Sequence, residues 1–78
     1  MKKLFDKYNG RQTVWEHNNN YYICSTAIEG CKPEVMVFTA DAEGYVTDYM
    51  DLYVHYDNVT DHNHHMSIFA KGLDNGSW

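Results

Sequence analysis

The segment from Glu34 to Asp48 restricts the possible folds of this chain more than any other segment. It begins with an apolar run of β-branched and aromatic residues, continues through a turn sequence at residues 41–44, and resumes as a second β-prone run at Tyr45. This order of strand formers, turn formers and strand formers predicts a β-hairpin. Because the hairpin is also the most hydrophobic local unit, we expect the other segments to pair with it or to cover it.

The first strand of this hairpin has two faces, because successive side chains of a strand point to opposite sides. One face carries Met36, Phe38 and Ala40, and the other carries Val35, Val37 and Thr39. We expect Met36 and Phe38 to form the structural centre of the protein.

Strands are also predicted before the hairpin. Residues 3–8 alternate weakly and precede Asn9-Gly10, a dipeptide typical of type I′ turns, which favours a short strand over the alternative of a helix. Residues 12–17 are β-prone and stop at the polar cluster 18–20, where a turn is expected. Residues 21–28 form a further strand with both faces partly covered. Its favoured core face consists of Tyr22, Cys24, Thr26 and Ile28.

The strand 21–28 ends in a segment that interrupts a sheet. Within residues 29–33, Gly30 permits unusual φ values and Pro33 cannot donate a ladder hydrogen bond. After the central hairpin, residues 48–52 are ambiguous between a strand end and a loop. Apolar and polar residues then alternate from Leu52 to Tyr56, which is typical of an antiparallel edge strand.

The last third of the chain predicts a helix of about three turns. Thr60 is a plausible N-cap, and Gly72 fits the C′ position. Apolar residues and histidines recur at helical spacing in between; they are His62, His65, Met66, Phe69 and Leu73. The sequence therefore predicts one α+β domain spanning residues 1–78. It consists of an antiparallel sheet of four to five strands in meander order, with the C-terminal helix packed on one face.

The two cysteines are expected to be unpaired. Cys24 lies in the middle of a predicted strand and Cys31 in the following connection. We therefore expect their Cα atoms to be farther apart than a disulfide allows. A buried, free Cys24 fits the usual behaviour of unpaired cysteines. A disulfide between the two is the alternative.

Charge is distributed unevenly along the chain, whose net charge is −5. Four of the six lysines and arginines fall within the first eleven residues, and residues 33–70 contain none. This stretch is acidic and rich in tyrosine. Such a surface repels nucleic acid but attracts basic proteins, including those that bind nucleic acid. The candidate partner-binding residues are Asp41, Glu43, Tyr45, Asp48, Tyr49, Asp51, Tyr53 and Asp57.

Size and hydropathy bear on the oligomeric state and the cellular location of the protein. A chain of 78 residues forms a core of only marginal stability, so a monomer and a small homo-oligomer both remain open. No apolar run reaches the length of about 18 to 20 residues that a membrane span needs, and the N-terminus lacks the apolar core of a signal peptide. We expect an unprocessed cytosolic protein.

Histidines are the most conspicuous chemical groups. His55, His62 and His65 could form a small metal- or ligand-binding module, since imidazole is a common ligand of zinc and nickel. No histidine pair has the i, i+4 separation of the usual helical metal motif, however, and neither a metal nor another cofactor is predicted. Cys24 or Cys31 could be combined with His17 or His55 as nucleophile and base. Neither cysteine has a setting that lowers a thiol pKa, so an enzyme is not expected.

Several short motifs resemble a group of small uncharacterised proteins of bacteriophages and prophages. The shared pattern comprises residues 34–38, the acidic glycine turn 40–44, the segment 46–49 and the pair Asp51-Leu52, followed by a histidine-containing helix. The group has E-T-M-V-F and V-T-D-W where this chain has Val35 and Tyr49. The resemblance covers about half of the chain, from residue 34 to residue 69.

This resemblance implies that the chain is a phage accessory protein acting in the host bacterial cytosol. Together with the acidic, tyrosine-rich surface, it leads to the hypothesis of a non-enzymatic inhibitor. Its partner would be a basic host defence protein that handles nucleic acid, of the CRISPR or restriction type, with no direct contact to nucleic acid or membrane. The alternative is the histidine-based metal or ligand module.

Overall fold

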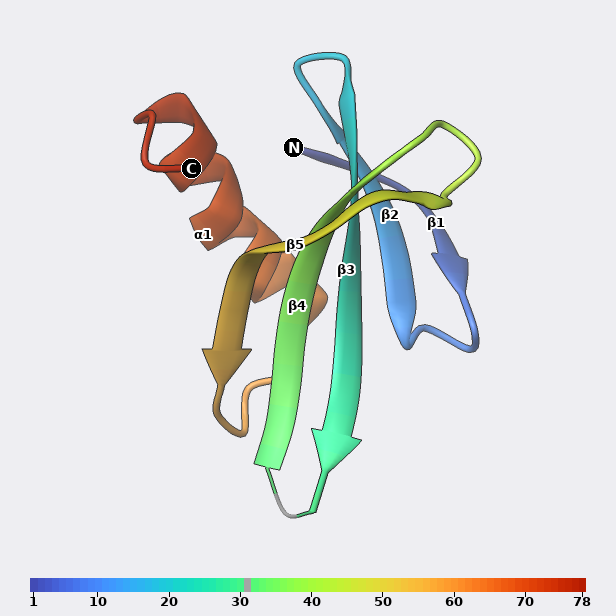
Figure 1. Ribbon diagram of the computed structural model, residues 1–78, viewed down its shortest axis with the longest axis vertical. Coiled ribbons are helices and arrows are strands. Elements are labelled where there is room, and N and C mark those ends of the chain that lie inside the picture. The colour runs from blue at the N-terminus through green and yellow to red at the C-terminus, as the bar shows by residue number, and fades with distance from the viewer. Residues whose placement is uncertain (31) are drawn as a thin grey trace.

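An antiparallel sheet in meander order is the framework of the protein (Figure 1). A computed structural model describes the backbone of residues 1–30 and 32–78, and the side chains of these residues apart from 29, 32 and 49–51. Within this part of the chain the sheet order is β1-β2-β3-β4-β5. The elements are β1 (Lys2–Lys7), β2 (Gln12–His17), β3 (Asn20–Glu29), β4 (Lys32–Ala40), β5 (Val46–Tyr56) and α1 (His62–Asp74). The predicted α+β fold is therefore confirmed.

The turns of the first two hairpins contain residues with positive φ. Asn18 and Asn19 have φ values of 52° and 66°, which short polar side chains tolerate better than others. The β1–β2 turn is centred on Tyr8 and Asn9, with φ values of 53° and 56°, one residue earlier than the predicted Asn9-Gly10. The amide of Gly10 closes this turn by donating to the Lys7 carbonyl at 3.2 Å. The strand prediction for the first residues is confirmed, and the helix alternative is wrong.

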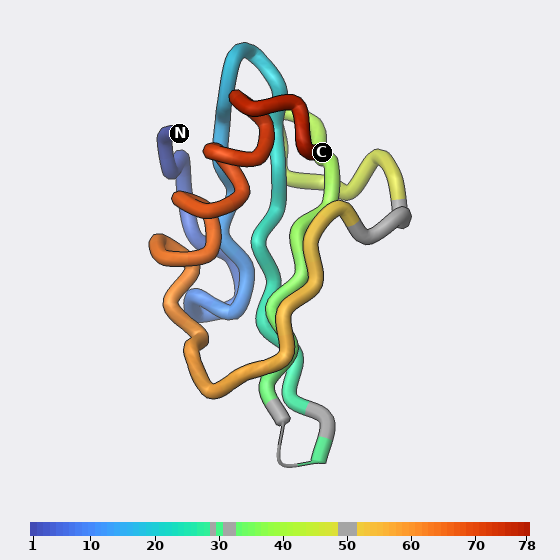
Figure 2. Tube along the Cα trace, turned by 90° about the vertical axis from the view of Figure 1, so that its left-hand side faces the viewer, coloured from blue at the N-terminus to red at the C-terminus, as the bar shows by residue number. Residues whose placement is uncertain are grey.

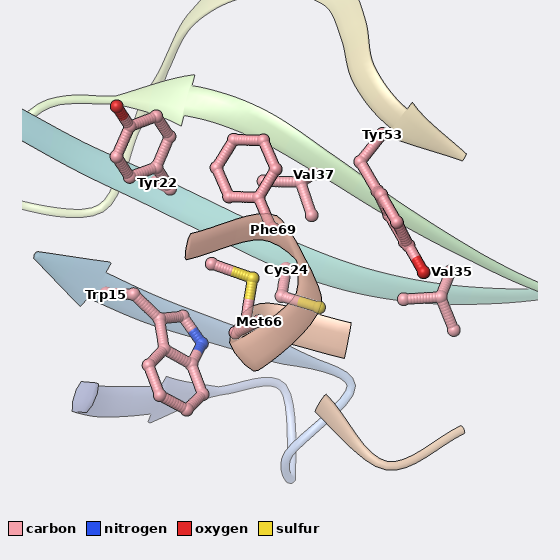
Figure 3. Packing of buried hydrophobic residues seen from close by; sticks show 8 residues of the cluster. All are labelled: Trp15, Tyr22, Cys24, Val35, Val37, Tyr53, Met66 and Phe69. Atoms are coloured by element: carbon pink, nitrogen blue, oxygen red, sulfur yellow. The ribbon is translucent and has the colours of Figure 1, made fainter. Parts of the chain in front are cut away.

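One face of the sheet, here called the helix face, packs against α1. Its buried residues and those of α1 form one cluster (Figure 3), which consists of Trp15, Tyr22, Cys24, Val35, Val37, Tyr53, Met66 and Phe69. The ring of Phe69 meets that of Tyr22 edge-on, with centroids 5.1 Å apart. Tyr22 and Cys24 thus lie on the core face, as predicted for β3. Ile28 does not, because the β3–β4 hairpin extends past the ends of β2 and β5 and leaves it 66% exposed.

The prediction that Met36 and Phe38 are the structural centre is wrong. Val35 and Val37 are the buried residues of β4, with exposures of 1% and 0%, while Met36 and Phe38 are only partly buried. Both faces of this strand are apolar, so alternation alone does not select one. The helix brings the large side chains of Met66 and Phe69, and these fit over the smaller valines and Cys24.

The opposite face of the sheet is partly covered by the connection between β4 and β5. Figure 1 shows α1 and this connection on opposite sides of β3 and β4, and in Figure 2, viewed from the left of Figure 1, the helix lies in front. Gly44, at the end of the connection, lies against Val14 and Phe5, and a Cβ built on it would be 2.9 Å from Val14 Cγ2. This approach helps to bury Val14 and Ile23 on the face that α1 does not reach.

The ends of α1 differ from the prediction by one to four residues. Asp61, not Thr60, is the N-cap, and its carboxylate accepts from the amide of Asn63 at 3.0 Å. Asn75 is the C-cap, and Gly76 follows with a φ of 73°. Gly72 lies inside the helix instead, where the indole of Trp78 occupies the space that a Cβ would need. The C-terminal tail therefore folds back over the helix, and Trp78 packs on Tyr53 and Phe69 with ring centroids 5.8 and 5.6 Å away.

The choice of core face can be tested with two valines on adjacent strands. Val37→Ala should lower the free energy of unfolding by about 2 kcal/mol, because it removes fully buried methyl groups and leaves a cavity. Val54→Ala removes the same atoms from a partly exposed position on the other face, so the loss should stay below about 1 kcal/mol. Urea unfolding of both variants measures the difference, and equal losses would contradict the assignment.

A second comparison isolates the packing at Gly44. Gly44 and Gly10 share a φ of +85°, so an alanine at either position carries the backbone cost of about 1–2 kcal/mol. Only at Gly44 does the new Cβ also collide with Val14 and Phe5. Gly44→Ala should therefore destabilise the protein by at least about 1 kcal/mol more than Gly10→Ala, measured as the difference in urea unfolding. Equal effects would mean that the connection does not pack on the sheet.

Candidate functional site

The acidic turn between β4 and β5 is a well-defined structure, here called the hairpin tip (residues 41–45). The Asp41 carboxylate accepts from the amides of Glu43 and Tyr45 at 3.0 and 2.9 Å. The Asp41 backbone pairs with the same turn, donating to the Tyr45 carbonyl at 2.9 Å and accepting from Gly44 at 3.1 Å. Asp41 therefore organises the tip, while the side chains of Glu43 and Tyr45 are exposed.

Lys7 of β1 anchors the hairpin tip to the rest of the sheet. Its ammonium group donates to the Gly44 carbonyl at 2.7 Å and lies 5.0 Å from the centroid of the Tyr45 ring. A cation over an aromatic face is attracted by the ring quadrupole, so this contact also orients the tyrosine. Tyr45 remains 66% exposed despite it. The tip is thus held in one place relative to β1, with an acidic and an aromatic side chain pointing to solvent.

The other predicted partner-binding residues do not all lie near the tip. Asp48 is exposed near the start of β5, opposite Thr39, whereas Asp57 follows the end of that strand. Asp57 accepts from the Val59 amide at 2.8 Å and pairs with His55 at 2.7 Å. The nine residue steps from Asp48 to Asp57 span up to about 30 Å in an extended strand. The side chains of Tyr49 and Asp51 lie outside the described part of the chain.

Tyr53 was predicted to contact a partner, but it belongs to the core. It is 9% exposed, and its hydroxyl forms a hydrogen bond of 2.7 Å with Nδ1 of His65. Burial, together with the negative charge of Asp57, raises the pKa of the Tyr53 hydroxyl. The hydroxyl therefore remains protonated and can donate to His65. The alternation of β5 grouped this tyrosine with polar neighbours, but α1 packs on the face that carries it.

His65 is held by hydrogen bonds at both ring nitrogens. Its Nε2 lies 2.7 Å from the carbonyl of Val59, which can only accept, so this nitrogen carries a hydrogen. In the neutral ring, Nδ1 then accepts from Tyr53. The rings of His55 and His64 lie on either side, each with its centroid 5.3 Å from that of His65. His65 thus connects β5, the segment before α1 and α1 itself.

His62 joins the N-terminal end of α1 to two strands. Its Nδ1 is 2.8 Å from the hydroxyl of Thr13, and its Nε2 is 2.6 Å from that of Thr26. The hydroxyl of Thr13 also accepts from the indole of Trp15 at 2.6 Å. Burial lowers the pKa of His62, with His65 adding to the effect and Asp61 opposing it. The neutral ring is therefore the form that fits this polar network.

The metal-binding form of the histidine module has no geometric basis among the described residues. His62 and His65 direct their ring nitrogens into separate networks, and no group of three histidine, cysteine or acidic side chains in this part of the chain could hold a metal ion. The cysteine chemistry considered above is also unsupported at Cys24, which is a buried free thiol. Burial raises the pKa of Cys24 to about 12, so it is not a thiolate near neutral pH. Cys31, and with it the disulfide alternative, lies outside the described residues.

Sequence reasoning found the buried stripe of α1 but missed its partners. His62, His65, Met66 and Phe69 are the buried residues of the helix, and all four were marked by their spacing. Nothing in the sequence indicated that Thr13 and Thr26 would form hydrogen bonds with His62, because these bonds join residues 49 and 36 positions apart. Lys7 was likewise counted only as part of a basic N-terminus, 37 positions from Gly44.

Comparison with protein-family models, curated proteins and solved structures found no match for this chain. Among the described residues, no helix is long and apolar enough to cross a lipid bilayer.

The low pKa of His62 predicts a loss of stability in mild acid. Below about pH 6.5 the unfolded chain binds a proton at this residue that the folded chain excludes. The free energy of unfolding should therefore fall as the pH drops from about 7.5 to about 5.5, because protonation disrupts the bonds to Thr13 and Thr26. His62→Gln keeps hydrogen-bonding groups but cannot titrate, so its urea unfolding midpoint should fall less over the same range. An identical pH dependence of variant and native chain would contradict this role.

Proposed function

We propose that this protein is a non-enzymatic phage accessory protein of the host cytosol that binds and inhibits a nucleic-acid-handling defence protein. Two observations from the sequence motivate the class of partner: the stretch without lysine or arginine from residue 33 to residue 70, and the resemblance to small phage proteins. A basic protein that normally holds nucleic acid would be attracted to such a surface, and its nucleic-acid site would be blocked.

The observation that carries the proposal is the fixed hairpin tip. Asp41 and Lys7 hold the turn from two sides, so the exposed Glu43 and Tyr45 have little conformational freedom to lose on binding. Tyrosine provides a large contact area at low entropic cost, and acidic groups steer a basic partner toward it. Asp48, exposed at the start of β5, extends the same end of the hairpin.

The geometry narrows the contact surface relative to the full acidic stretch. Asp41 and Asp61 are used to cap a turn and a helix, and Asp57 is paired with His55. Tyr53 lies in the core. Glu43 and Tyr45 are therefore proposed as the principal contacts, with Asp48 beside the hairpin tip and Asp57 at the far end of β5 in secondary roles.

Charge reversal at the hairpin tip tests the proposal. A tagged native chain should capture basic, nucleic-acid-handling proteins from a nuclease-treated bacterial lysate, and mass spectrometry identifies them. Glu43→Lys combined with Asp48→Lys should reduce their recovery at least about tenfold, because two steering charges become repulsive. Both side chains are exposed, so the variant should remain folded, and a cooperative urea unfolding transition checks this.

A matched control makes the same change in net charge elsewhere. Glu34→Lys combined with Asp74→Lys alters acids near the start of β4 and at the end of α1, and Glu34 lies toward the opposite end of β4 from the hairpin tip. This variant should capture the same proteins as the native chain. Equal loss in both variants would mean that only net charge matters, and undiminished capture by the tip variant would exclude the tip as the binding surface.

A further inference from the structure

A polar cleft of about 490 Å³ opens on the helix face beside the beginning of α1. Its walls come from β1, the β1–β2 turn, the end of β3 and the segment that enters α1. The side chains of Lys3 and Asp6 of β1 line one side of the cleft, where α1 does not cover them. The volume lies within the range of about 300–1,000 Å³ that is usual for small-molecule sites.

The floor of the cleft is rigid and already satisfied in its hydrogen bonding. Thr13, Thr26 and His62 line it and bond to one another, with the two hydroxyls on opposite nitrogens of the imidazole. The two acids at the cleft also have partners within the chain. Asp6 pairs with Lys3 at 2.7 Å, and Asp61 accepts from the amide of Asn63. These groups shape the cleft and leave recognition of a ligand to the remaining side chains.

Arg11 is the charged group at the cleft with unused binding capacity. Its backbone is fixed at the end of the cleft, because its amide donates to Tyr8 at 3.1 Å and its carbonyl accepts from Thr26 at 3.0 Å. The side chain is exposed, and the ion pairs found among the described side chains do not include it. A guanidinium presents paired N–H donors that match the oxygens of a phosphate or carboxylate. The neutral groups of Asn63 and Thr60 lie at the same cleft.

We propose that this cleft binds a small phosphorylated sugar or polyol. The phosphate would pair with the Arg11 guanidinium, while Lys3 stays paired with Asp6 in the wall. Hydroxyl groups of the ligand would bond to the amide of Asn63 and the hydroxyl of Thr60. The lining contains no aromatic ring other than the imidazole in the floor, so a nucleobase would find no stacking surface. The site is independent of the hairpin tip and of its proposed function.

Titration of the isotope-labelled chain with ribose 5-phosphate, followed by amide NMR, tests the site. The amide signals of Gly10, Arg11 and Asn63 should shift and reach saturation. Inorganic phosphate should shift the signal of Arg11 with weaker affinity, and ribose alone should shift none of the three. Shifts that do not saturate, that lie elsewhere in the chain, or that ribose reproduces would overturn the proposal.

Two substitutions with the same change in charge separate specific from general attraction. Arg11→Gln should weaken the binding of ribose 5-phosphate at least tenfold, since it removes the paired donors. Lys71→Gln removes a positive charge in the last turn of α1, outside the cleft, and should leave the affinity within twofold of the native value. Equal weakening by the two variants, or full affinity in Arg11→Gln, would show that the cleft is not a phosphate site.

Discussion

The packing of Met66 and Phe69 of α1 onto the helix face of the sheet is the interaction on which the rest of the structure depends. These side chains cover Val35, Val37 and Cys24, which are almost fully buried. Once the helix lies there, His62 and His65 are also withdrawn from water and must find hydrogen-bond partners, because an unpaired buried polar group costs about 1–3 kcal/mol. Threonines and a tyrosine provide them, so the apolar contact determines the position and the polar groups make it specific.

Local patterns in the sequence predicted most of the fold. The turn residues at 18–19 and 41–44, the β-prone runs and the helical spacing after residue 61 were sufficient for the meander and for α1. The core face of β4 was not predictable, because both of its faces carry apolar side chains and periodicity is symmetric between them. In β5 the alternation favoured the face of Leu52 and Val54, whereas α1 covers the face of Tyr53. Met36 and Tyr53 were misassigned for these two reasons. Choosing between faces required the volumes of Met66 and Phe69, which lie on a separate element after β5.

The sequence predicted which residue types form the candidate surfaces, but not what each residue does there. The sequence marked the acids from Asp41 to Asp57 as one group, yet Asp41 satisfies backbone amides and Asp57 pairs with a neighbouring histidine. Short acidic side chains close to turns and helix starts commonly have such local partners. Arg11, in contrast, was not marked as a binding residue, because it is one of several basic residues near the N-terminus. Only the fold places it at the end of a cleft.

The meander order has a consequence for how the chain assembles. Each strand pairs with the next one in sequence, so closing the sheet requires only short loops with a low entropic cost. Docking of α1 and of the hairpin tip joins residues that are much farther apart, 49 positions for His62 with Thr13 and 37 for Gly44 with Lys7. These two docked parts are held by contacts between residues distant in sequence. Each of them forms one side of a candidate surface. Local opening of either would therefore remove a binding surface while the sheet persists.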